Sequence, residues 1–219
     1  MATPNDRATF ETVLRWMVEN LEVASSVYRT PTGRLRVHSA LHSNAQGHVL
    51  RRHNRAPHDR DDWLLNSATA LLACCYAEAL GKTLRPRKRT LGKKKPKKSK
   101  GARRGSGPNF IRFQSFVRRY MPDLVAECRD RGGRFSIRTF YKTYRNGFVH
   151  QFAHNKARWR RRGQQAPYWF SSGGYPGINV DRLAAGVIAA IAQFRIAFPL
   201  DARNGRHPYR NFVRRLDAD

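Results

Sequence analysis

The 219-residue sequence predicts an all-α fold: one domain, a bundle of four to five helices with little strand. Two observations favour this class. Apolar residues recur at helical spacing in five windows, and Gly or Pro residues separate these windows. Only the Gly-, Pro- and Ser-rich stretch 163–180 leaves room for a short strand. Hydrophobic residues make up 40% of the chain and aromatic residues 11%, which is enough for a sizeable core.

The first predicted helix runs from Phe10 to about Tyr28 and ends before the breakers Pro31 and Gly33. Its apolar positions follow a helical period: Phe10, Val13, Leu14, Met17, Val18 and Leu21. Residues 34–60 are polar and rich in Arg and His. They are expected to form a loop with at most a short helix.

The second predicted helix spans 61–80, "DDWLLNSATALLACCYAEAL". It begins with acidic residues, which suit a helix N-terminus, and it is apolar on most sides. We therefore expect a central, buried helix, with Gly81 as its C-cap.

Three further windows complete the bundle. The pattern at 109–131 contains Pro122, which predicts a kink or break, and Gly132 and Gly133 end it. A helix is expected from about Ser136 to His154. The last helix spans 183–198, with Asn179 or Asp181 as its cap and Pro199 as its stop. The tail from Asp201 is polar and basic.

The formal net charge of +28 indicates a polyanionic partner, most commonly nucleic acid; an anionic membrane surface is the weaker interpretation. Residues 84–105 contain 12 Lys or Arg and no acid, so they predict a disordered linker or insertion. The rest of the chain still carries +16, because 28 − 12 = 16.

Cysteine usage and the N-terminal residues predict a cytoplasmic protein. Cys74, Cys75 and Cys128 form no C-x-x-C motif and are expected to be buried free thiols in a reducing compartment. No signal sequence is apparent at the N-terminus. The most apolar window, 183–194, is expected to be too short to span a bilayer.

The stretch "YRNGFVH" places polar residues at a defined spacing within an aromatic helix. At 100° per residue, one face of this helix gathers Ile137, Phe140, Tyr141, Tyr144, Phe148 and Phe152. Asn146 and His150 lie nearly opposite that stripe, and Arg145 lies at its flank. Replacing Arg145 or His150 is therefore expected to change stability by no more than about 0.5 kcal/mol.

These three residue types suit metal-independent cleavage of RNA, with no cofactor. The His150 imidazole can serve as a base or acid near neutral pH. Arg145 can hold a phosphate and stabilise the charge that develops on it, and Asn146 can orient either group. The attacking group would be the ribose 2′-OH next to the scissile phosphate.

The motif resembles the R-x4–6-H motif of the HEPN superfamily, helical proteins that include many metal-independent ribonucleases of toxin and antiviral defence systems. The resemblance implies an endoribonuclease with Arg145, Asn146 and His150 as catalytic residues. It also implies a homodimer in which two motif helices share one cleft. Arginines at other spacings that the motif permits also precede His42 and His58, but no asparagine follows those arginines. The alternative is a non-catalytic, basic α-helical nucleic-acid-binding protein.

The run "KARWRRRG" follows the motif directly and is expected to contact RNA, with Trp159 stacking on a base. The predicted contact residues are Lys156, Arg158, Trp159, Arg160, Arg161 and Arg162. The alternative is a solvated helix end whose cations suit the helix dipole. Five histidines between 38 and 58 lack a ligand pattern, so a basic loop is expected and no metal site. "PYWF", residues 167–170, is expected to pack in the core.

Overall fold

The structure, a computed structural model, describes residues 4–29, 35–37, 63–84, 107–130, 136–146, 158–172 and 175–217. Seven α-helices lie in these ranges, together with one two-stranded and one three-stranded sheet. The predicted mainly helical class is therefore confirmed. The predictions made for the histidine-rich loop, for most of 84–105 and for Gly132 and Gly133 lie outside the described residues.

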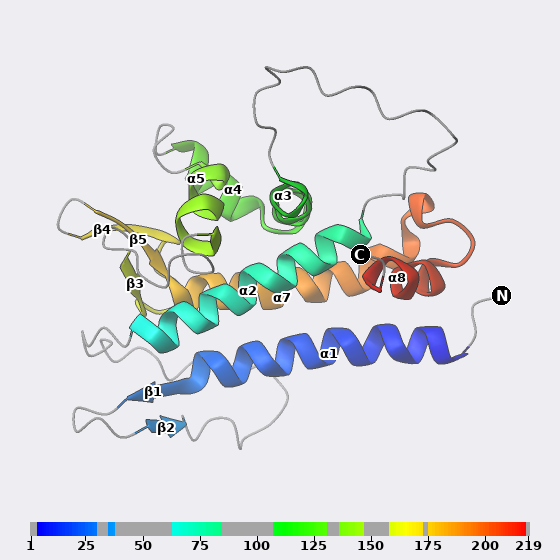
Figure 1. Cartoon of the computed structure of the whole chain (residues 1–219), viewed down its shortest axis with the longest axis horizontal. Coiled ribbons are helices and arrows are strands. Elements are labelled where there is room, and N and C mark those ends of the chain that lie inside the picture. Colours follow the sequence, from blue (N-terminus) through cyan, green and yellow to red (C-terminus); the bar gives the residue numbers. More distant parts are fainter. Residues whose placement is uncertain are drawn as a thin grey trace.

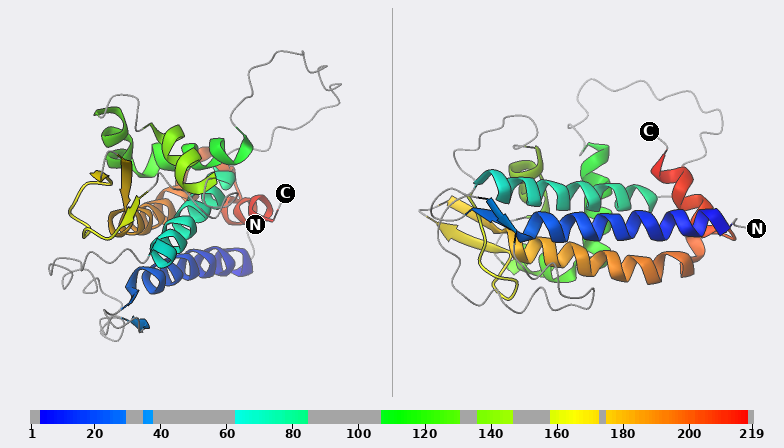
Figure 2. Two further views of the ribbon diagram at one scale, coloured as in Figure 1. Left: turned by 60° about the vertical axis from the view of Figure 1, so that its left-hand side comes forward. Right: turned by 90° about the horizontal axis from the view of Figure 1, so that it is seen from below.

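Three long helices form the base of the fold: α1 (Pro4–Ser26), α2 (Trp63–Thr83) and α7 (Val180–Leu200). They lie side by side along the long axis of the molecule, and α1 runs opposite to α2 and α7 (Figure 1). A view from below shows α1 in front of the other two (Figure 2). The predicted apolar stripe of the first helix is buried at Phe10, Leu14, Met17 and Leu21.

A second layer crosses this base and consists of α3 (Pro108–Tyr120) and α4 (Pro122–Asp130). The predicted break at Pro122 is confirmed, because α3 ends at Tyr120 and α4 begins at Pro122. Figure 1 shows α3 nearly end-on above α2. The sequence predicted Gly81 as the C-cap of this helix, but Gly81 lies inside α2. A Cβ on Gly81 would collide with the Arg112 carbonyl of α3, so the glycine permits close contact between these helices.

The N-terminus of α7 is capped as predicted, since the Asn179 side chain accepts a hydrogen bond from the Arg182 backbone N–H. The alternative cap, Asp181, instead accepts from the Gly163 N–H. Pro199 lies inside the last turn of α7, so the helix ends one residue after the predicted stop.

The tail contains structure that the sequence did not predict: a short 3₁₀ turn, η4 (Ala202–Asn204), and α8 (Pro208–Leu216). Phe212 of α8 is fully buried, and its ring lies 4.9 Å from that of Phe10 and 5.7 Å from that of Phe198. The helix is only nine residues long and contains three arginines, so its apolar period is easily overlooked.

Short strands lie at the other end of the long helices. β1 (Val27–Arg29) pairs antiparallel with β2 (Leu35–Val37), so the first helix ends at Ser26 rather than Tyr28. The three-stranded sheet has the order β3-β5-β4, formed by β3 (Arg158–Arg160), β4 (Trp169–Ser172) and β5 (Tyr175–Asn179). β3 is parallel to β5 and β4 is antiparallel to it. The strand expected within 163–180 is thus confirmed.

The core is aromatic, and "PYWF" belongs to it as predicted, since Tyr168, Trp169 and Phe170 are all buried. Of the three cysteines, Cys74 and Cys128 are buried free thiols as expected. Cys75 is exposed, which corrects the prediction for that residue.

α7 is a core helix, and Phe194 and Phe198 are fully buried. It is also the one described helix that is long and apolar enough to cross a membrane by length and composition. The helix is longer than the apolar window 183–194 on which the expectation was based, because it extends to Leu200 and has 21 residues. A buried core helix meets the same criterion, so it is weak evidence for a membrane span.

Candidate functional site

The described part of the motif helix is not a regular α-helix. It begins as α5 (Ile137–Phe140), whose N-cap Ser136 accepts a hydrogen bond from the Thr139 N–H at 3.1 Å. It continues as the π-helical turn η3 (Tyr141–Asn146). Ile137, Phe140 and Tyr141 are buried, which confirms the first part of the predicted aromatic stripe.

The π-helical turn changes the direction in which Arg145 points. A π-helix closes i→i+5 hydrogen bonds, so it rotates less per residue than the 3.6-residue helix used for the prediction. The angles predicted beyond Tyr141 therefore do not apply. Arg145 was expected at the flank of the apolar stripe, as a surface residue, but its side chain is only 16% exposed and pairs with Glu78 of α2.

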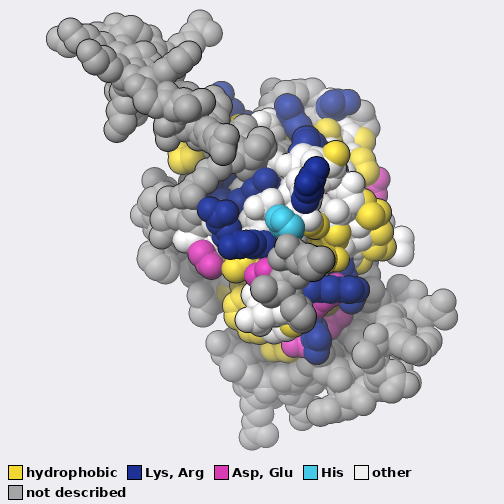
Figure 3. Space-filling model, turned by 90° about the vertical axis from the view of Figure 1, so that its right-hand side faces the viewer, with side chains coloured by type: hydrophobic (Ala, Val, Ile, Leu, Met, Phe, Trp, Pro, Cys, Tyr) yellow, Lys and Arg dark blue, Asp and Glu magenta, His cyan; other side chains and the backbone are white. Residues whose placement is uncertain are grey.

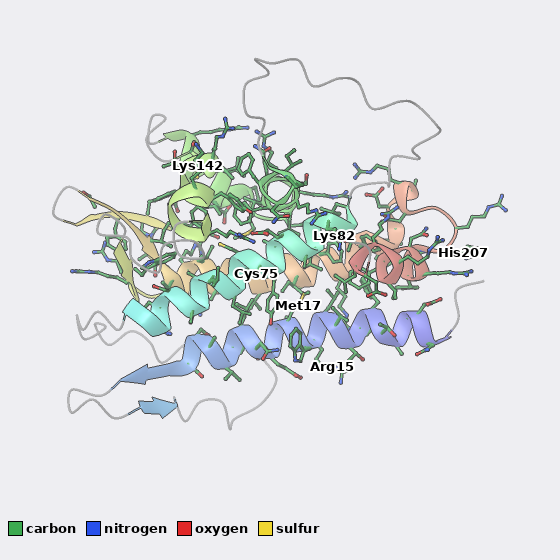
Figure 4. All side chains as sticks on the ribbon, viewed as in Figure 1. Arg15, Met17, Cys75, Lys82, Lys142 and His207 are labelled. Carbon is green, nitrogen blue, oxygen red and sulfur yellow. The ribbon has the colours of Figure 1, made fainter. Side chains whose placement is uncertain are left out.

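Arg145 forms a two-bond ion pair with Glu78 of α2. Its Nε donates to Oε1 at 2.5 Å and its Nη2 donates to Oε2 at 3.0 Å. The Glu78 side chain is 10% exposed, so both charges are largely removed from water. In Figure 4 the π-helical turn, marked by Lys142, lies above the part of α2 marked by Cys75. The pair therefore fixes the motif turn to the central helix.

Glu78 was not among the residues predicted for the site, although the sequence carries a signal for it. Glu78 is the one acidic residue in the apolar run "LLNSATALLACCYAEAL" of the second predicted helix. A buried carboxylate needs a cationic partner, because an isolated charge is very costly in a protein interior. The sequence therefore signals that Glu78 has a cationic partner, but among 43 Lys and Arg residues it does not show which one.

The ion pair alters the acid–base properties of its neighbours. Burial, and then the Glu78 carboxylate, raise the pKa of the Tyr141 phenol, so this group stays protonated. Burial alone would lower the pKa of Arg145, but hydrogen bonding to Glu78 and its charge outweigh burial and raise it. Burial and Glu78 also raise the pKa of the Cys75 thiol, while Arg145 partly offsets them. Arg145 thus remains a cation throughout the physiological range.

Arg145 retains donors for a second ligand. A guanidinium carries five N–H groups, and the bonds to Glu78 use two of them. The other N–H groups form no hydrogen bond within the described residues and suit donation to a phosphate oxygen. His150 lies outside the described residues, and for Asn146 the structure describes the backbone but not the side chain. The convergence of the three predicted catalytic residues stays a prediction.

The predicted RNA-binding run differs from expectation at Trp159. Lys156 lies outside the described residues, and the side chain of Arg158 is not described. Residues 158–160 form strand β3 rather than a helix end, and Trp159 pairs with Ile178 of β5. The Trp159 side chain is 7% exposed and belongs to the core. Stacking on a base conflicts with this burial, because a base needs an open face of the ring.

Arg161 of the same run has a structural role. Its guanidinium donates to the backbone carbonyls of Ala24 and Ser25, to Asn66 Oδ1 at 3.0 Å and to Asp181 Oδ1 at 3.3 Å. It therefore joins the C-terminal turn of α1 to α2 and α7.

The two flanking arginines differ in exposure. Arg160 is half-buried, whereas Arg162 is exposed with its guanidinium 5.0 Å from the Phe170 ring centroid. Of the predicted RNA-contacting side chains that the structure describes, Arg162 is thus the one that solvent reaches freely.

Protein-family models, curated proteins and solved structures gave no match to this chain. Its class is therefore defined by fold and composition alone. It is a mainly α-helical, strongly basic protein with a small mixed sheet and a buried arginine–glutamate pair in a π-helical turn.

Proposed function

We propose that this protein is a HEPN-like, metal-independent endoribonuclease that acts on RNA as a cytoplasmic homodimer, of the toxin or antiviral defence type. The observation that carries the proposal is the π-helical turn that holds Arg145 against Glu78, five residues before His150. π-Helical turns occur frequently at functional sites. A fixed guanidinium with unused N–H groups also suits recognition of a phosphate.

The proposed reaction breaks the RNA backbone by internal transfer. An imidazole of His150 takes the proton from the ribose 2′-OH, and the oxygen attacks the adjacent phosphorus. The bond to the 5′-oxygen breaks, and that oxygen leaves with a proton. Arg145 stabilises the charge on the phosphate, and Asn146 orients the imidazole or the phosphate. In the dimer, a second copy of the motif supplies the other acid or base.

This chemistry predicts specific products and controls. Cleavage should persist in EDTA and leave 2′,3′-cyclic phosphate and 5′-hydroxyl ends. DNA, and RNA with a 2′-O-methyl group at the cleavage position, should remain intact because neither offers the attacking hydroxyl. Cleavage that EDTA abolishes, or cleavage of DNA, would contradict the proposed mechanism.

A second candidate is a non-catalytic nucleic-acid-binding protein. The observation that favours it is the burial of Arg145, because an ion pair with Glu78 explains the arginine without any catalytic role. This candidate predicts RNA binding that weakens steeply with salt, as the net charge of +28 implies, and no cleavage under any condition.

A further inference from the structure

The outer face of α8 and the turn that precedes it carry arginines with no role in holding the fold. Arg206, Arg210 and Arg214 are exposed. None of the three has an ion pair or a side-chain hydrogen bond within the described part of the chain. Arg210 and Arg214 lie one helical turn apart on the side opposite the buried Phe212.

The inner cations of this end have a different role. Arg215 donates to the Thr83 carbonyl at the C-terminus of α2, at 2.6 Å. In return, Lys82 of α2 donates to the Leu216 carbonyl at the C-terminus of α8, at 2.9 Å. Each helix thus supplies a cation to the other helix's negative end, and this exchange fixes the orientation of α8. The outward direction of Arg210 and Arg214 is therefore defined by the fold.

Many other described arginines are paired with a carboxylate. Such pairs hold Arg119, Arg145, Arg161, Arg182, Arg195 and Arg203. Two like charges four residues apart on a helix repel each other and destabilise it slightly. The cations on the α8 face are therefore unpaired, and the repulsion between Arg210 and Arg214 slightly destabilises the helix. A bound anionic partner would remove this repulsion.

This face belongs to a basic end of the molecule. Figure 4 places His207, which precedes α8, at the end of the long helices away from the sheet. Seen from that end, Lys and Arg side chains lie on several sides of the histidine, with hydrophobic and acidic side chains between them (Figure 3). Arg7 of α1 adds a further exposed cation, with its guanidinium 6.0 Å from the Tyr209 ring centroid. Asp201, an acid on the neighbouring η4 turn, is already occupied by Arg119 and Arg203.

We infer that Arg206, Arg210 and Arg214 form a binding surface for the sugar–phosphate backbone of single-stranded RNA, at a different place from Arg145. The positive end of the α8 dipole lies beside Arg206 and adds to the attraction for phosphate. The choice of RNA over DNA rests on the proposed function. The contact itself does not, because backbone binding needs no cleavage.

The test is a salt titration with full-length protein and an RNA oligonucleotide that is 2′-O-methylated throughout and so cannot be cut by this mechanism. For single strands, each phosphate that the protein neutralises contributes about 0.7 to the slope of log K against log salt. The triple variant R206Q/R210Q/R214Q should therefore reduce the slope by about 2. Arg214→Gln alone should reduce it by about 0.7.

A matched triple variant, R15Q/R118Q/R129Q, removes the same charge from exposed positions on α1, α3 and α4. It should leave the slope nearly unchanged. Equal reductions in both triple variants would overturn the inference, because binding would then depend on total charge and not on this surface. A triple variant R206Q/R210Q/R214Q that keeps RNA binding but no longer binds phosphatidylserine vesicles would also overturn it, in favour of a membrane partner. A parent protein that binds but never cleaves would refute the nuclease proposal and leave this inference intact.

Discussion

Arg145 and Glu78 join the π-helical turn to the centre of α2 through two hydrogen bonds, at 2.5 Å and 3.0 Å. Both side chains are largely buried, so neither charge can be rehydrated if its partner is removed. This pair gives Arg145 a structural role, whether or not it also contacts a phosphate. Any study of its catalytic role must therefore separate stability from activity.

Arg145→Ala should lower the free energy of unfolding by about 3 kcal/mol, since breaking a buried ion pair from one side typically costs about 3–5 kcal/mol. This replaces the expectation of about 0.5 kcal/mol that the sequence suggested for a surface residue. Urea denaturation of the parent and the variant measures the difference.

The double variant R145M/E78L serves as the companion to this test. It removes both charges and fills the space with apolar groups, so it should recover most of the stability that Arg145→Ala removes. Arg118→Ala, at an exposed position of α3, should change the free energy of unfolding by less than about 0.5 kcal/mol. A destabilisation by Arg145→Ala no larger than that by Arg118→Ala would show that the pair contributes little.

Gly81→Ala should destabilise the protein by about 1–3 kcal/mol, because the new methyl group meets the Arg112 backbone carbonyl. Helix propensity alone predicts the opposite, a gain of about 1 kcal/mol for this change inside a helix. Thermal unfolding followed by circular dichroism separates the two. Gly107→Ala is the control, because nothing lies within 4 Å of a Cβ there. If Gly81→Ala raises the melting temperature, α2 and α3 do not approach as described.

Asp201 should contribute to stability in a pH-dependent way. Hydrogen bonds from Arg203 and Arg119 lower the pKa of the Asp201 carboxyl below its ordinary value. The bonds from Arg203 have the largest effect and outweigh burial, which by itself would raise the pKa. A folded-state pKa below the unfolded one stabilises the protein above about pH 4, the unfolded value, and the benefit disappears as the pH falls further.

Asp201→Asn should therefore melt at a lower temperature than the parent at pH 6, and the difference should shrink below pH 4. Asp123→Asn, which removes a carboxylate whose side chain is 70% exposed, is the control and should show a small difference throughout. A gap between Asp201→Asn and the parent that stays constant from pH 6 to pH 3 would contradict the ion-pair role.

The fold class could be predicted because long helices repeat their apolar residues many times. The stripe of α1, the break at Pro122 and the Asn179 cap each follow from local rules of spacing and backbone geometry. α8 and β3 were missed for a local reason as well. Both are short and rich in arginine, so their few apolar residues give too weak a period, and tertiary packing decides their structure.

The candidate site could be predicted only as a set of residue types. A helical wheel placed Arg145 and Asn146 off the apolar stripe, as surface residues. The wheel assumes a regular α-helix, so it does not reveal the π-helical turn. Glu78 lies 67 residues away, and a local pattern does not connect it to Arg145. Trp159 illustrates the converse error: its basic neighbours suggest solvent, whereas pairing of β3 with β5 buries the ring.

The most direct test of the proposed function is the cleavage rate of His150→Ala on an RNA substrate in EDTA, compared with the parent. General acid–base catalysis typically contributes about 10²–10⁴-fold, so the variant should cleave more slowly by about that factor. RNA affinity should barely change, because most of it comes from other cations. His42→Ala and His58→Ala, at positions that also follow arginines at spacings the motif permits, should cleave like the parent. Cleavage by His150→Ala at the parental rate, or a parent that never cleaves RNA, would contradict the nuclease proposal.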